Sequence, residues 1–227
     1  MHVIELLDYD LDSNGLGSGL QSCFFSAEKG EVWKLEADNI NDSHLFINGL
    51  ATLAYPSKGT YSFNGKVLNF SDYRHLLSAK KKIGYLTSET TLISNRTIRE
   101  NLTLNKVYFE NNLSPELSDT EMSMCELFML NTILDVRPVK LTASDIKKTI
   151  LVRELLKKPD VIIIEFPDEF SGYHARNDLI TVLQKAVESG VILVYSSYDQ
   201  VFISAFSHKT ISIKDGILNQ VPLKQRV

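Results

Sequence analysis

VWKLEADNINDSHLFINGLATL, residues 32–53, places a short polar loop between a strand and a helix. Residues 32–35 have the hydrophobic character of a strand. Residues 43–53 carry apolar side chains at the spacing of one helical face, with Asp42 or Ser43 as the expected N-cap. A strand that runs through a loop into a helix is an arrangement in which α/β proteins bind phosphate, so this stretch predicts an α/β fold.

The loop itself has the wrong chemistry for phosphate. Phosphate loops are rich in glycine and end in lysine, because backbone amides and an ammonium group neutralise the phosphates. Residues 36–44 contain neither residue type and carry Asp38 and Asp42. We therefore interpret the loop as a polar turn that caps a helix, in preference to a nucleotide site.

Composition sets the broad class. The 227 residues are 44% hydrophobic and 23% charged with a net charge of −4, which fits one globular domain over residues 1–227. Such a charge argues against nucleic-acid binding through bulk electrostatics. Residues 80–82, three lysines, are expected at a solvated helix end. Cys23 and Cys125 indicate neither a disulfide framework nor a zinc site.

No targeting or membrane segment is evident in the sequence. Residues 1–10 lack a basic start and a long apolar run, and no stretch reaches the roughly 18 apolar residues of a membrane helix. We expect a soluble, cytoplasmic protein that reaches the inner face of a membrane only through a partner.

The first third of the chain reads as β-rich. Strands are predicted over residues 3–7, 21–25 and 31–35, with a hairpin over 59–67 that turns at Asn64-Gly65. The glycine-rich residues 15–19 precede a strand, whereas a phosphate cradle lies between a strand and a helix, so we interpret them as a flexible hairpin turn.

The rest of the chain alternates helices and strands. The predicted elements are helices over 97–104, 116–134 (opened by Ser114-Pro115), 142–157 (capped by Thr142 with Asp145 three residues on) and 174–188, strands over 161–165 and 191–195, and a hairpin over 210–218. A βαβ-type core interrupted by a helical subdomain, roughly residues 89–155, follows from this order.

Frame residues spread along the chain resemble the ATPase subunits of ABC transporters. They are Gly30-Glu31-Val32, Pro56, Gly59-Thr60, residues 82–85, Arg99-Glu100-Asn101, and Leu141, Arg153, Leu155, Pro159-Asp160 and Pro167. The resemblance implies a P-loop NTPase fold: a RecA-like α/β core with an N-terminal antiparallel β part and a helical insert. It also implies a dimer that works with a membrane subunit.

The residues that carry the family's chemistry are changed. At the degenerate nucleotide-binding positions the chain has Ala37, Asn39, Ile40, Asp42, Ser43 and His44, with Ser43 in place of the lysine and His44 in place of the magnesium-binding hydroxyl. Asp38 and Asp42 would repel a polyphosphate by about 1 kcal/mol at ~4 Å even in water.

The remaining motifs also lack the residues that carry the family's chemistry. Ser88 replaces the loop glutamine, Phe166 the catalytic glutamate and Ser197 the switch histidine, and no aromatic residue stands at 12–14 to stack on adenine. The signature segment reads Leu141, Thr142, Ala143, Ser144 and Asp145, and the Walker B acid is Glu165. Thr142 is expected to cap a helix, or else to contact a partner's nucleotide. Glu165 is expected to be a hydrogen-bonded strand end and not a metal ligand, and Phe166 a core residue.

Three functions follow from this resemblance. The first is a catalytically inactive ABC ATPase-like subunit, structural or regulatory in a membrane transport complex, paired as a homo- or heterodimer with an ABC membrane subunit or an active ATPase subunit. The second is an ATP-binding subunit with weak or remodelled hydrolysis, and the third a soluble adaptor. No cofactor is expected under the first; ATP and magnesium belong to the second.

Overall fold

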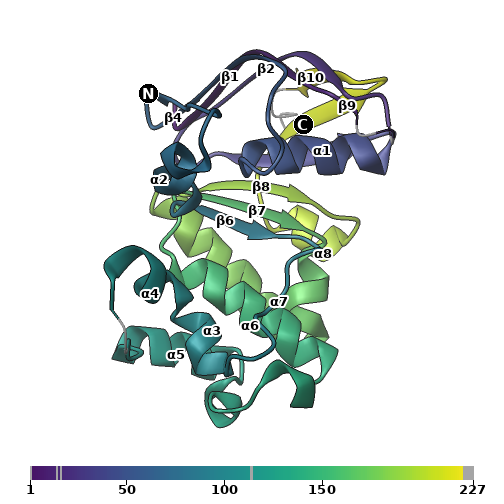
Figure 1. Cartoon of the computed structure of the whole chain (residues 1–227). Coiled ribbons are helices and arrows are strands. Elements are labelled where there is room, and N and C mark those ends of the chain that lie inside the picture. The colour runs from purple at the N-terminus through teal and green to yellow at the C-terminus, as the bar shows by residue number, and fades with distance from the viewer. Residues whose placement is uncertain (1, 14, 16, 113–114, 222–227) are drawn as a thin grey trace.

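The computed structural model describes residues 2–13, 15, 17–112 and 115–221. It has two sheets, a helix between them, and a helical region on the far side of the larger sheet (Figure 1). This is the predicted α/β cassette with an antiparallel N-terminal part.

The larger sheet has six strands in the order β10-β9-β3-β8-β7-β6. Its strands are β3 (Val32–Ala37), β6 (Ile83–Leu86), β7 (Val161–Glu165), β8 (Ile192–Ser196), β9 (Lys209–Lys214) and β10 (Ile217–Val221). All neighbours are parallel except β9 and β10, which form the predicted C-terminal hairpin. Every residue of β7 is buried, as a strand covered on both faces requires.

The smaller sheet is antiparallel, in the order β2-β1-β4-β5. It consists of β1 (Ile4–Leu11), β2 (Leu20–Ala27), β4 (Lys58–Phe63) and β5 (Lys66–Val67). Asn64 and Gly65 connect β4 to β5 with φ values of 49° and 74°, which confirms the predicted two-residue turn. Residues 12–19 connect β1 to β2, as predicted for a hairpin.

The core divides into two layers around the larger sheet. α1 (Ile40–Leu50) lies between the two sheets and contributes Phe46, Ile47 and Leu50 to one cluster. α6 (Ala143–Leu156) and α7 (Pro167–Glu188) cover the opposite face in a second cluster (Figure 1). The short helices α2 (Leu77–Lys80) and α8 (Gln200–Ser204) lie at the edges.

The helical region differs from the predicted elements in its bounds. Residues 97–104 are divided into α3 (Ile98–Leu102) and the start of α4 (Leu104–Glu110). The long helix predicted over 116–134 is wrong: α5 runs only over Asp119–Leu127, because Ser118 and Glu121 form a reciprocal capping box that starts it later. Ser114, the predicted opening residue, lies outside the described residues.

Two further expectations need correction. α7 begins at Pro167 and not at residue 174, because Pro167 opens the helix and a non-helical Gly172, with φ of 68°, lies within it. The lysines at 80–82 stand at a helix end, but they are not simply solvated. Lys80 donates to the Thr52 carbonyl at 3.0 Å and Lys82 to the Lys158 carbonyl at 3.2 Å.

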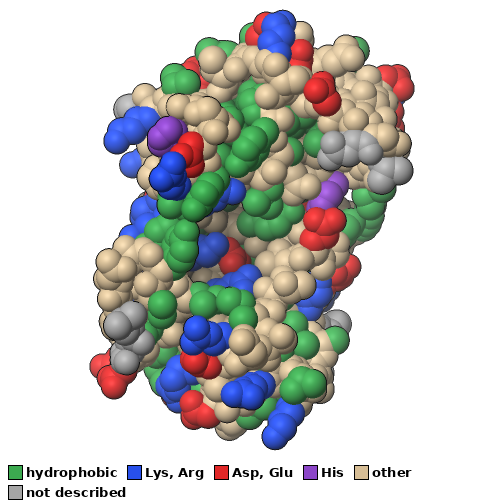
Figure 2. Space-filling view, viewed as in Figure 1, with side chains coloured by type: hydrophobic (Ala, Val, Ile, Leu, Met, Phe, Trp, Pro, Cys, Tyr) green, Lys and Arg blue, Asp and Glu red, His purple; other side chains and the backbone are tan. Residues whose placement is uncertain are grey.

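The surface is mixed in charge, and acidic and basic side chains are interspersed over the face drawn in Figure 2. Within the described ranges, none of the helices has both the length and the apolar composition that a membrane crossing would need.

Candidate functional site

The connection between β3 and α1 is too short for a phosphate loop. Only Asp38 and Asn39 lie between Ala37, the last residue of β3, and Ile40, the first of α1. The N-cap is Asn39 and not Asp42 or Ser43 as predicted, because the Asn39 side chain accepts from the Asn41 amide at 2.9 Å and starts the helix earlier.

Asp42 points toward the turn between β1 and β2. Its side chain is fully buried, and Oδ1 accepts from the backbone amides of Ser18 at 2.9 Å and Gly19 at 3.2 Å. A Cβ atom at Gly17 would lie 2.3 Å from the same oxygen, so only glycine fits there. The glycine-rich turn predicted to be flexible is thus anchored to α1 by a carboxylate.

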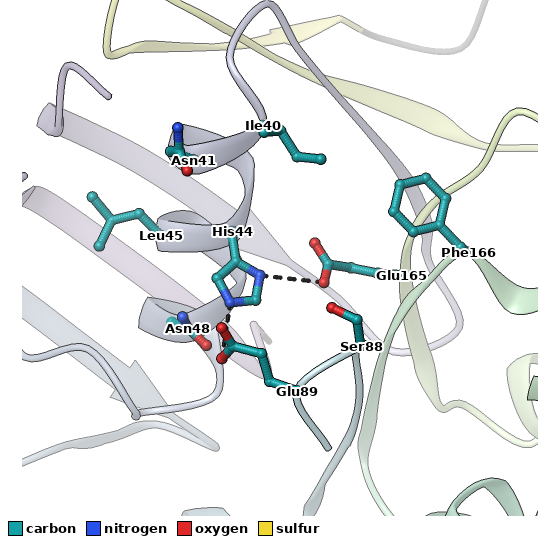
Figure 3. A pocket seen from close by; sticks show the side chains of 9 residues that line it. All are labelled: Ile40, Asn41, His44, Leu45, Asn48, Ser88, Glu89, Glu165 and Phe166. Carbon is teal, nitrogen blue, oxygen red and sulfur yellow. Dashed lines mark hydrogen bonds and ion pairs between the residues drawn. The ribbon is translucent and has the colours of Figure 1, made fainter. Parts of the chain in front are cut away.

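His44 lies at the centre of a cavity of about 460 Å³ (Figure 3). Its lining residues are Ile40, Asn41, His44, Leu45, Asn48, Ser88, Glu89, Glu165 and Phe166. His44 Nδ1 lies 3.3 Å from Glu165 Oε2, and Nε2 lies 3.2 Å from Glu89 Oε2 as an ion-pair contact. The two ring nitrogens of His44 thus face two carboxylates, one at the end of β7 and one in the loop after β6.

Glu165 ends β7 and is 5% exposed. Burial raises the pKa of its carboxyl, and the nearby carboxylates of Glu89 and Glu169 raise it further, while His44 opposes the shift. Its contact with His44 confirms the predicted hydrogen-bonded carboxylate at a strand end.

A second cavity, of about 560 Å³, adjoins the first through Ile40, Glu165 and Phe166. Its other lining residues are Lys34, Leu35, Glu36, Ala37, Asp38, Ser43, Ser196, Ser197 and Tyr198. Ser43 is 8% exposed and is one of the polar residues of this lining. Lys34 is the only lysine or arginine of either lining, and it pairs with Glu36 at 2.6 Å.

Phe166 is a cavity-lining residue, so its interpretation as a core residue is wrong. Its φ of 50° is left-handed, and its ring stacks on Tyr198 with centroids 5.9 Å apart and planes at 27°. Tyr198 is 85% exposed. The Phe166 ring lies at the surface because its backbone is the N-cap of α7, with its amide bonded to the Ser196 carbonyl at 2.9 Å.

The other predicted site residues divide into two groups. Ala37 and Ser43 line the second cavity, and Ser88 lines the first. Thr142, Ala143 and Ser144 are exposed at the start of α6 and line neither.

The signature-like segment is a helix cap. Thr142 and Asp145 form a full capping box, in which the Asp145 amide donates to Thr142 Oγ1 at 3.2 Å. The predicted capping role of Thr142 is therefore confirmed.

The remaining altered motif positions have their own local partners. Ser197 is buried, and its hydroxyl accepts from the Asp199 amide at 3.0 Å. Asp12 accepts from the Ser57 hydroxyl at 2.9 Å, whereas Asn14 lies outside the described residues.

Sequence reasoning missed Glu89 and Tyr198. Each directly follows a motif position that had been examined, Ser88 and Ser197, so this adjacency was the available signal.

These residues do not fit magnesium and ATP. The two-residue connection leaves no loop to surround a phosphate, and the one cation of the linings is already paired. In the part of the chain that the structure describes, no three side chains of histidine, cysteine, aspartate or glutamate are grouped so as to hold a metal ion.

Comparison with known proteins gives the class of fold first. The chain matches the ATP-binding cassette MJ0796, in a dimeric post-hydrolysis state bound to ADP and Pi, with a TM-score of 0.81 over 98% of this chain and 100% of that one, at 18% identity. A nucleotide-free ATP-binding cassette from an ABC transporter matches with a TM-score of 0.75 at 14% identity. The fold is that of an ABC ATPase cassette.

The sequence relatives then indicate the family. The macrolide export ATP-binding/permease protein MacB of Campylobacter jejuni is 26% identical over 198 residues, which is 87% of this chain and 31% of MacB. The molybdenum import ATP-binding protein ModC of Salmonella choleraesuis is 23% identical over 172 residues, or 75% of this chain and 47% of ModC. The chain thus spans about a third to a half of these relatives, and no family model matches it. The curated proteins that this chain is similar to are thus ABC-transporter ATP-binding proteins.

Proposed function

We propose that this protein is a catalytically inactive ABC ATPase-like subunit that serves as a structural or regulatory partner in a membrane transport complex. The observation that carries the proposal is the two-residue connection between β3 and α1. The phosphate-loop motif G-x-x-x-x-G-K-[ST] needs the residues between its two glycines in a loop, so that their backbone amides can surround the phosphates.

The electrostatics of the site support the same proposal. The position of the phosphate-neutralising lysine is Ser43, and Lys34 is bound to Glu36. Glu36, Asp38, Glu89 and Glu165 also line the cavities, so a polyphosphate would meet carboxylates without a free cation to offset them.

Hydrolysis lacks its base as well. The residue after the Walker B position is Phe166, which accepts no proton from water. Glu165, the nearest carboxylate, is buried and held by His44 through Oε2.

The partner is inferred from the relatives. MacB is named as both an ATP-binding and a permease protein, and the MJ0796 cassette is dimeric. We propose that this chain docks peripherally at the inner face of the cell membrane, on an ABC membrane subunit, through residues 89–155 and the surface beside Ser88. In a head-to-tail pair its Thr142–Ser144 segment would face the partner's nucleotide.

Titration of the purified chain with labelled ATP and magnesium tests the inactivity. We expect no saturable binding in the micromolar range and no phosphate release. Micromolar binding, or turnover that Glu165→Gln abolishes, would overturn the proposal.

Two variants locate the cause of inactivity. Asp42→Gly with Ser43→Lys restores two motif residues but not the loop, and we expect it not to bind ATP. The matched control replaces residues 37–44 by an eight-residue glycine-rich phosphate loop, which restores the motif residues and the loop together. If the two-residue variant binds as tightly as the loop replacement, the backbone geometry is not the obstacle.

Co-purification tests the role in transport. The chain, tagged and isolated from membranes of its native cell, should retain an ABC membrane subunit or an active ATPase subunit. Recovery of the chain only in free form, without either class of subunit, would refute the transport role and favour the adaptor function.

A further inference from the structure

The second cavity contains hydrogen-bond acceptors without donors. Ser196 Oγ is buried and has no partner among the described residues, and Ser43, which is 8% exposed, lines the same cavity. Glu165 binds His44 through Oε2, while no described side chain contacts Oε1. Figure 3 shows that second oxygen on the side of Ile40 and outside the dashed contact with His44. Buried polar groups of this kind call for a partner.

The three groups come together for a topological reason. Glu165 and Ser196 are register partners at the ends of the parallel strands β7 and β8. Ser43 is in the first turn of α1, which leaves β3 on the other side of β8. Ligands of open α/β sheets bind at this carboxyl end of the strands.

The chemistry of the three groups selects the ligand. A primary ammonium carries three N–H donors and one positive charge, and two hydroxyl oxygens with a carboxylate accept all three. Beside them the stacked rings of Phe166 and Tyr198 offer an apolar surface and ring faces that attract cations.

We propose that this cavity binds the primary ammonium group of an aliphatic amine or polyamine, with Glu165, Ser43 and Ser196 as acceptors and the Phe166–Tyr198 pair against the hydrocarbon chain. This goes beyond the proposed inactivity toward ATP: it assigns the altered site a ligand of opposite charge. Burial raises the pKa of Glu165, and a bound ammonium would lower it again by supplying a counter-charge.

Calorimetry on the unmodified chain provides a test that needs no variant. n-Butylammonium and spermidine should bind saturably at neutral pH. Butyltrimethylammonium has the same charge but no N–H, and should bind at least about tenfold more weakly because three charge-assisted hydrogen bonds are lost. Equal binding of the two, or binding of neither, would overturn the proposal. The proposal would also be overturned if magnesium chloride bound more tightly than n-butylammonium and displaced it.

Matched variants then assign the acceptors. Glu165→Gln should weaken n-butylammonium binding about tenfold or more, whereas Glu188→Gln, at an exposed acid at the far end of α7 outside the cavity, should change it less than about twofold. Ser43→Ala and Ser196→Ala should each weaken it severalfold, with the exposed Ser204→Ala as control. Circular dichroism checks that each variant is folded; a folded Glu165→Gln with unchanged affinity refutes the site. The ATP titration is separate, so the two proposals fail independently.

Discussion

Gly17→Ala should unfold this protein more readily than Gly15→Ala, although both residues belong to one turn. Their φ values are 79° and 83°, so an alanine at either pays the same left-handed penalty of about 1 kcal/mol. The surroundings differ. A Cβ at Gly15 meets nothing within 4 Å among the described residues, whereas one at Gly17 lies 2.3 Å from Asp42 Oδ1.

The added cost at Gly17 comes from the bonds of Asp42. Its carboxylate has to move, and it then loses the amides of Ser18 and Gly19. Each hydrogen bond to a charged group contributes about 1.5–3 kcal/mol, and the Ser18 amide belongs to an exposed residue that water can reach. We therefore expect Gly17→Ala to lower the free energy of unfolding by about 2–3 kcal/mol more than Gly15→Ala does.

Urea denaturation of both variants measures the difference, and a double-mutant cycle identifies its origin. In an Asp42→Ala background the carboxylate is absent, so the gap between Gly17→Ala and Gly15→Ala should shrink below about 0.5 kcal/mol. Equal destabilisation by the two single variants would refute the anchoring of this turn by Asp42. A gap that persists without Asp42 would place the clash elsewhere.

Three further predictions concern the edge of the site and the helix cap. Phe166→Gly should leave the free energy of unfolding nearly unchanged, because relief of the left-handed φ of 50° offsets the loss of the Tyr198 stack. Phe166→Ala loses the stack without that relief and should lower the free energy of unfolding by about 1 kcal/mol. Urea melts in which the glycine variant is the less stable of the two would contradict this. The pKa of Glu165 is raised above 4.5 in the folded chain, so the Glu165 carboxyl stays protonated to higher pH in the folded state than in the unfolded state. The contribution of Glu165 to the free energy of unfolding therefore falls as the pH rises above 4.5. Glu165→Gln should therefore be more stable relative to the parent at about pH 8 than at about pH 4, and a constant difference would refute the shift. Thr142→Ala should lower the free energy of unfolding by about 1 kcal/mol because the α6 cap is lost, whereas Thr142→Ser should lower it little. Equal urea midpoints for the parent and both variants would exclude the capping box.

Much of the fold could be predicted because its signals are local. The apolar run of β7, the Asn64-Gly65 turn and the Thr142–Asp145 box each specify their own structure through burial, positive φ or reciprocal capping. The bounds of α5 were missed because competing caps at 114 and 118 cannot be ranked from sequence alone.

The site was predictable only in part. Its location beside Glu165 follows from the strand order, and the residue types at Ser43 and Phe166 can be read from the sequence. The contacts of His44 with both Glu89 and Glu165 are not visible, since they join α1 to a loop after β6 and to the end of β7.

The sequence by itself determined that residues 36–44 contain neither glycine nor lysine and that Phe166 follows Glu165. Only the tertiary structure decided what the replacements do. Asp42 turns inward to the amides of Ser18 and Gly19, whereas Ser43 turns into a cavity that ends in Glu165. The direction of a side chain on a helix depends on where that helix begins, and here Asn39 starts α1 before the loop can form.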